Sequence, residues 1–119
     1  MNPIDLKEAI KRRVRLGGVS FVELARDIPS AFGGNVVLGG FETLVVWTGL
    51  SKDGAEAVLS LVQTGEIHMT PTSMLVYAID GRLLNLPIAK RVQSYKRLHW
   101  LPVVFNPGPV APVKRGAAR

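Results

Sequence analysis

Charged residues or glycines interrupt every apolar stretch of this 119-residue sequence, and their spacing favours short helices and strands. No apolar run approaches the roughly 20 residues that a membrane-spanning helix needs. Apolar residues nevertheless make up 47% of the chain, which favours a folded core over disorder. The sequence therefore predicts one globular domain over residues 1–106, followed by a flexible basic tail rich in Pro, Gly and Ala over residues 107–119.

Three segments have helical periodicity and recognisable ends. Asn2 and Pro3 suit the start of a first helix, and Gly17 suits its end because glycine tolerates the left-handed conformation. Ser20 and Glu23 have the spacing of a capping box at the start of a second helix. The predicted helices cover residues 3–15, about 21–28, and the segment SKDGAEAVLSLVQ, with Ser51 as its cap and Gly65 as its stop.

Strands are expected between these helices and after the third one. The segment from Leu44 to Trp47 is rich in β-branched and aromatic residues, which favours a strand buried on both faces. Residues Glu66–Met69 and Met74–Ile79 are predicted to form two strands, joined by a polar turn that contains Pro71.

The order helix, short strand, helix, connecting segment, helix and hairpin is similar to that of a winged helix-turn-helix domain. The resemblance covers roughly residues 3–81 and is carried by SFVELARDI, SKDGAEAVLSLVQTG and EIHMTPTSMLVYAID. It implies a small α+β domain of winged-helix type, in which the third helix enters the DNA major groove and the hairpin, or wing, touches phosphates or the minor groove. The residues that it places at DNA are Lys52, Glu56, Ser60, Gln63 and Thr64 on the helix, and Thr70, Thr72 and Ser73 at the wing tip.

The net charge of +6 is distributed unevenly along the chain. Residues 1–15 carry +3, residues 16–80 carry −5, and residues 81–119 carry +8 without a single acidic residue. The third predicted helix offers Lys52 beside Asp53 and Glu56, so attraction for phosphates is expected elsewhere. Because all formal charges of residues 81–119 are positive, this part of the chain favours a polyanionic or acidic partner.

An added C-terminal helix is predicted from Asn85-Leu86-Pro87 to about Leu98. On this helix an apolar stripe is expected to face the core, with cations on the opposite side. The stripe consists of Ile88, Val92, Tyr95 and His99. The residues predicted to contact nucleic acid are Lys11, Arg12, Arg13, Arg15, Arg82, Lys90, Arg91, Lys96, Arg97, Lys114 and Arg115.

These features predict a non-enzymatic nucleic-acid-binding module, with duplex DNA as the leading ligand and transcriptional or replication regulation as its role. The N-terminus lacks the apolar centre of a secretory signal, which favours a cytoplasmic location without a membrane partner. The chain has no cysteine, and His68 and His99 are far apart in sequence, so neither a metal nor another cofactor is predicted.

Two alternatives remain open at this point. In one, the protein is an interaction adaptor or a homodimeric structural protein, and the region of Phe32, Phe41 and Trp47 supplies apolar contacts, although Trp47 itself is expected in the core. Apart from these alternatives, Trp100 is expected to pack in the core, and the other interpretation of Trp100 is that it stacks on bases. A small enzyme is the weakest alternative, because no residue pattern indicates a reaction.

Overall fold

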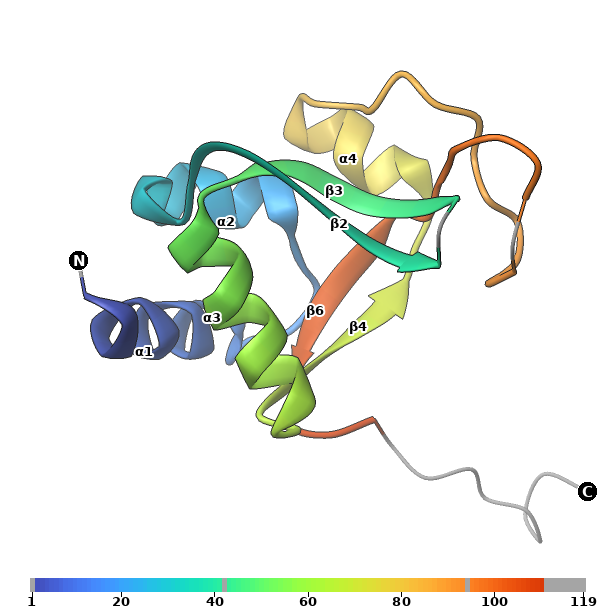
Figure 1. Ribbon diagram of the computed structural model, residues 1–119. Coiled ribbons are helices and arrows are strands. Elements are labelled where there is room, and N and C mark those ends of the chain that lie inside the picture. Colours follow the sequence, from blue (N-terminus) through green and yellow to red (C-terminus); the bar gives the residue numbers. More distant parts are fainter. Residues whose placement is uncertain (1, 42, 94, 111–119) are drawn as a thin grey trace, which may run out of the picture.

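The computed structural model describes residues 2–41, 43–93 and 95–110. Over these residues the chain forms a mixed α/β fold with four α-helices and two three-stranded sheets (Figure 1). Within the described residues, no helix combines the length and the apolar character that crossing a membrane requires.

The N-terminal helices form where capping side chains begin them. The Asn2 side chain accepts a hydrogen bond from the backbone of Asp5 at 2.9 Å and begins the first helix. Ser20 and Glu23 form the predicted capping box at the second helix, and the Ser51 hydroxyl accepts a bond from Gly54 at the third. The first three predicted helices are therefore confirmed as α1 (Pro3–Val14), α2 (Phe21–Asp27) and α3 (Lys52–Gln63).

The first sheet joins strands from opposite ends of the chain. The C-terminal strand β6 lies in its centre and pairs antiparallel with β1 on one side and β4 on the other. Helix α1 packs against α3 and contacts β6. The strands are β1 (Val19–Ser20), β4 (Ile67–Pro71) and β6 (Val103–Pro107).

The second sheet is built on a hairpin inserted between α2 and α3. Strand β3 lies in its centre, antiparallel to β2 and parallel to the short strand β5. A single turn of 3-10 helix, η1 (Pro29–Ala31), precedes the hairpin. The strands are β2 (Phe32–Phe41), β3 (Leu44–Leu50), which includes the predicted strand, and β5 (His99–Trp100).

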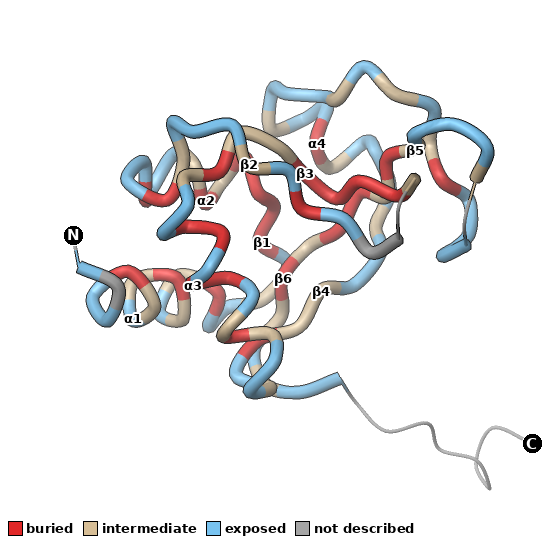
Figure 2. The backbone as a smooth tube through the Cα atoms, in the orientation of Figure 1, coloured by how far each residue is buried: buried red, intermediate tan, exposed pale blue. Residues whose placement is uncertain are grey.

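An aromatic cluster connects the two sheets in the buried interior, which Figure 2 shows in red. Trp47 of β3 lies 5.1 Å from Tyr77 between ring centroids, and Tyr77 lies 5.1 Å from Trp100. Phe21 stacks on Trp47 and packs edge-on against Phe105 of β6. Trp47 and Trp100 are 2% and 0% exposed, so their predicted place in the core is confirmed and base stacking by Trp100 is excluded.

Tyr77 also holds the cluster together through its hydroxyl group. The hydroxyl donates to the backbone oxygen of Val103 at 2.5 Å and accepts from the backbone nitrogen of Phe21 at 3.2 Å. Burial raises the pKa of this phenol, because the charged form has no water around it. One side chain thus connects the helix that carries it to α2 and to β6.

The predicted strand at Met74–Ile79 is wrong, because this segment is helix α4 (Met74–Asp80). The Ser73 hydroxyl accepts a hydrogen bond from the backbone of Leu75, and Gly81, at φ 98°, ends the helix in the left-handed conformation. Strand β6 takes the place beside β4, which leaves this segment without a strand partner. The predicted hairpin, with its wing tip at Thr70, Thr72 and Ser73, is therefore absent from the described residues: Thr70 lies within β4, and Ser73 caps α4.

The predicted C-terminal helix is also wrong, because the described residues 82–93 and 95–98 run irregularly from α4 to β5. Several backbone groups of this segment bond to other parts of the chain. Tyr95 donates its backbone N–H to the Thr43 hydroxyl, and Ala89 donates to the Trp100 carbonyl. Val92, expected to be buried, is 58% exposed. The four residues at helical spacing therefore do not form a buried stripe.

Candidate nucleic-acid interface

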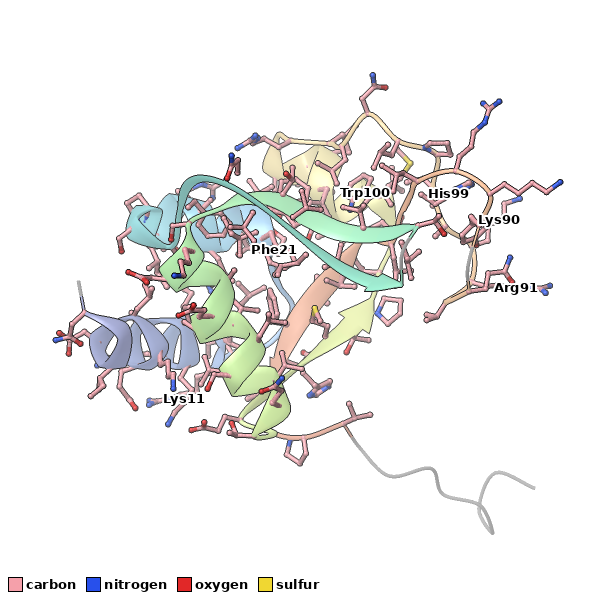
Figure 3. All side chains as sticks on the ribbon, viewed as in Figure 1. Lys11, Phe21, Lys90, Arg91, His99 and Trp100 are labelled. Atoms are coloured by element: carbon pink, nitrogen blue, oxygen red, sulfur yellow. The ribbon has the colours of Figure 1, made fainter. Side chains whose placement is uncertain are left out.

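The predicted cations of the described residues form two groups along the chain, and members of the two groups lie at opposite ends of the molecule. Lys11 projects from α1 at one end, and Lys90 and Arg91 lie together with His99 at the other (Figure 3). The α1 group comprises Lys11, Arg12, Arg13 and Arg15, and the 82–98 group comprises Arg82, Lys90, Arg91, Lys96 and Arg97. Lys114 and Arg115 lie outside the described residues.

Lys11 in the α1 group forms ion pairs with two carboxylates. Its Nζ atom lies 3.0 Å from Oε1 of Glu66 and 3.5 Å from Oε1 of Glu8. The hydrogen bond and the charge of Glu66 raise the pKa of Lys11. Hydrogen bonds from Thr64 and then from Lys11 lower the pKa of Glu66. The charge of Lys11 is thus compensated within the fold.

Arg13 is held by two acids of the neighbouring helix α2. Its Nη2 atom lies 2.7 Å from Glu23, and its Nε atom lies 2.5 Å from Asp27. Such a two-partner contact fixes the planar guanidinium and joins the two helices. Arg12 and Arg15 are exposed, and within the described part of the chain no ion pair includes them.

The 82–98 group lies in the connection between β4 and β6, beyond α4. Four of its cations are exposed, and none of the ion pairs among residues 2–41, 43–93 and 95–110 includes them: Lys90, Arg91, Lys96 and Arg97. The fifth cation, Arg82, lies 5.9 Å from the centre of the Trp47 ring, which suits a cation–π contact. The α1 group differs because carboxylates form ion pairs with two of its cations. Among the described residues, no carboxylate forms an ion pair with the 82–98 group.

An aromatic pair orders the part of this segment that carries Arg91. The rings of Tyr95 and His99 stack with centroids 4.0 Å apart and planes 15° apart. The Tyr95 hydroxyl accepts a hydrogen bond from the backbone nitrogen of Arg91 and donates to its backbone oxygen, both at 3.1 Å. The backbone of Tyr95 is bonded in turn to Thr43 beside β3 at 2.7 Å. Tyr95 thus joins the backbone of Arg91 to the second sheet.

Side chains of this segment and His99 line an open cavity of about 310 Å³. His99 accounts for part of its wall, and its Nδ1 lies 2.9 Å from the backbone oxygen of Arg97. Because a carbonyl oxygen only accepts, Nδ1 is the nitrogen that carries the proton. The residues that line the cavity are Ile88, Lys90, Arg91, Gln93, Tyr95 and His99, none of them acidic.

A second cavity, of about 260 Å³, lies beside the α1 group. Its cations are Lys11, Arg12 and Arg15, but Glu8 and Glu66 share its lining with Pro107. The two cavities therefore have similar sizes and differ in whether carboxylates accompany their cations. Every charged residue that lines the 82–98 cavity is a cation. The α1 cavity is lined by both cations and carboxylates.

The predicted contacts on α3 are spread over a face of mixed charge. Lys52, Glu56, Gln63 and Thr64 are exposed and Ser60 is half-buried. Thr64 is bonded to the Glu66 carboxylate at 2.7 Å. Asn106 donates to the Thr70 hydroxyl at 3.1 Å. These residues do not join the 82–98 group in one cationic surface.

The sequence did not indicate the contact between Tyr95 and Arg91, nor the cavity that forms beside it. The only available signal was the four-residue spacing of Tyr95 and His99, which also fits a helix. No three His, Asp or Glu side chains of the described residues come together as metal ligands would. His68, the other histidine, is bonded through Nδ1 to the backbone oxygen of Gly108 at 2.9 Å.

In comparisons with known proteins, the sequence matches no protein family and no curated protein, and the fold matches no solved structure. The function is therefore inferred from the residues and the geometry described above.

Proposed function

We propose that this protein binds nucleic acid, with duplex DNA as the leading ligand, through the 82–98 group. The observation that carries the proposal is the set of four exposed cations without an ion pair in the described residues, Lys90, Arg91, Lys96 and Arg97. Phosphates attract cations whose charge is not already compensated, and they release counterions on binding. The α1 group contributes less in this proposal, because carboxylates hold Lys11 and Arg13.

The order of the elements supports a winged-helix relationship within this proposal. Helices α1, α2 and α3 and strands β1 and β4 follow the order of the resemblance over residues 3–71, with the β2–β3 hairpin in the place of the connecting segment. Strand β6, which pairs with β4, lies outside the residues that the resemblance covers. The cations of the 82–98 group also lie beyond the part of the chain that the resemblance covers. A regulatory role in transcription or replication is proposed on the same ground.

The test is a fourfold variant, Lys90→Gln, Arg91→Gln, Lys96→Gln and Arg97→Gln, titrated with duplex and single-stranded probes at several salt concentrations. The affinity for duplex DNA is expected to fall on the order of a hundredfold at low salt, with a salt slope about 3 to 4 smaller. The matched control removes four other exposed or half-exposed cations: Lys7→Gln, Arg12→Gln, Arg15→Gln and Lys52→Gln.

This control is expected to lower the affinity much less, because its cations lie away from the 82–98 group. Binding that is absent from both probes, or that does not depend on salt, would contradict the proposal. Equal losses in the two fourfold variants would show that the overall charge, not this segment, determines binding.

A second candidate function is self-association or protein binding, favoured by exposed apolar residues on α4. Leu75 and Ile79, one helical turn apart, are 64% and 85% exposed. Strand β2 lies at the edge of its sheet, with Val37 55% exposed. Trp47 cannot supply this contact, because it is buried. Light scattering tests the candidate: a dimer that Ile79→Lys dissociates supports it, and a monomer at high protein concentration contradicts it.

A further inference from the structure

The cavity in the 82–98 group differs from a flat cationic surface because its donors line a concave space. Lys90 and Arg91 supply permanent positive charges, and Gln93 supplies an amide. The stacked rings of Tyr95 and His99 belong to the same lining. None of the lining residues is acidic, so an anion there meets no repulsion from the wall.

We propose that this cavity binds a phosphate monoester group, such as the terminal phosphate of a nucleic-acid strand or of a nucleotide. A monoester carries a charge near −2 and offers three strong acceptor oxygens. The two adjacent cations Lys90 and Arg91, together with the Gln93 amide, match such a group. The proposed function rests on phosphates along a strand, and the present inference deepens it by adding a place for a phosphate at the end of a strand.

The ordering of the loop supports a ligand of defined shape. Both backbone groups of Arg91 are bonded to the Tyr95 hydroxyl, and Tyr95 is attached to Thr43. His99 is fixed both by its stacking and by its bond to the backbone of Arg97. Phosphates along a strand require only a cationic surface, whereas a pre-ordered pocket lowers the entropic cost of holding one group.

The α1 cavity is an internal comparison for this inference. It contains three cations, one more than the 82–98 cavity, but Glu8 and Glu66 lie in its lining, and Lys11 forms ion pairs with both. A phosphate there would have to displace these carboxylates from Lys11. Selective binding at the 82–98 cavity therefore distinguishes a shaped site from general attraction to a basic protein.

The first experiment uses inorganic phosphate alone, with chloride at equal ionic strength as the reference, and follows backbone amide shifts by NMR. Saturable shifts are expected at Arg91, Gln93 and Tyr95, and they should be lost in Arg91→Gln and kept in Lys96→Gln, which removes the same charge outside the cavity. Shifts of equal size at Arg12 and Arg15, or no saturable shifts, would overturn the proposal.

The second experiment compares one strand with a 5′-phosphate and the same strand with a 5′-hydroxyl. The phosphorylated strand is expected to bind about tenfold more tightly, the value of one charge-assisted hydrogen bond of moderate strength. Arg91→Gln should bring this ratio to one, whereas Lys96→Gln should weaken both strands and leave the ratio unchanged.

The two experiments separate this inference from the proposed function. Equal binding of the two strands overturns the monoester pocket and leaves the proposed function standing. Saturable binding of inorganic phosphate at the cavity, with no binding of either strand, supports the pocket and contradicts the proposed function. A ratio that stays above one in Arg91→Gln also overturns the pocket, because the preference then arises elsewhere.

Discussion

The two cationic ends of this molecule have similar residues and different surroundings. At the α1 end, Glu8 and Glu66 hold Lys11, and Glu23 and Asp27 hold Arg13. At the other end, Lys90, Arg91, Lys96 and Arg97 form no ion pair within the described residues. A count of basic residues therefore does not locate a binding surface, because the packing of the chain decides which charges are already compensated.

After the fourfold variant of the 82–98 group, the largest effect is expected from making the α1 end resemble the other one. In Glu8→Gln with Glu66→Gln, the two carboxylates of the α1 cavity lose their charge while its three cations remain. Affinity for duplex DNA at low salt is expected to rise about tenfold, with a salt slope about 1 to 2 steeper. A titration over a range of salt concentrations measures both. An unchanged affinity would show that these carboxylates do not control access to the α1 cations.

A smaller effect, on stability, is expected from Arg13→Gln. This change leaves Glu23 and Asp27 without their cationic partner between α1 and α2. Asp27 is 43% exposed, so solvent screens the pair, and the expected loss of unfolding free energy is about 1 kcal/mol. Urea denaturation measures it.

The matched control for Arg13→Gln is Lys96→Gln, which is expected to change stability by less than about 0.5 kcal/mol. Equal losses in the two variants would remove the distinction between a structural cation and a cation available for binding.

Removing one hydroxyl tests the order of the 82–98 cavity. Tyr95→Phe keeps the ring that stacks on His99 and removes both hydrogen bonds to Arg91. The preference for a 5′-phosphate is expected to fall about threefold, because Arg91 is then less well ordered before binding. Affinity for the 5′-hydroxyl strand should stay within about twofold. A preference that does not change would mean that the hydroxyl does not order the site.

The smallest effect concerns pH and the α1 end alone. Folding lowers the pKa of Glu66 below its ordinary value of 4.5, so its contribution to stability is present above that value and is lost as the pH falls through the lowered pKa. The unfolding free energies of the wild type and Glu66→Gln, measured as a function of pH, should therefore converge on acidification below pH 4.5. The pH dependence from Lys11 has the opposite sign. Because folding raises the pKa of Lys11, its contribution to stability is present below pH 10.5 and is lost as the pH rises further. Curves that stay parallel below pH 4.5 would contradict this.

Elements whose signals lie within a few residues were predictable from the sequence. Asn2, Ser20 and Ser51 accept the expected hydrogen bonds at the helix starts, and Gly65 follows the end of α3. The identity of the candidate cations was also predictable, because the excess of basic residues in the C-terminal part can be counted directly from the sequence. A cap or a glycine stop depends on neighbours along the chain, so the tertiary structure does not have to supply the partner.

The segment between β4 and β6 depended on partners that are distant in sequence. Strand β6 pairs with β4, so residues 74–80 became a helix with Tyr77 as its buried residue. Bonds to Thr43 and Trp100 hold Tyr95 and Ala89 outside a helix. The sequence by itself thus determined the early helices and identified which residues are the candidate cations. Only the tertiary structure decided which cations are paired and where a cavity forms, because both depend on contacts between residues far apart in the chain.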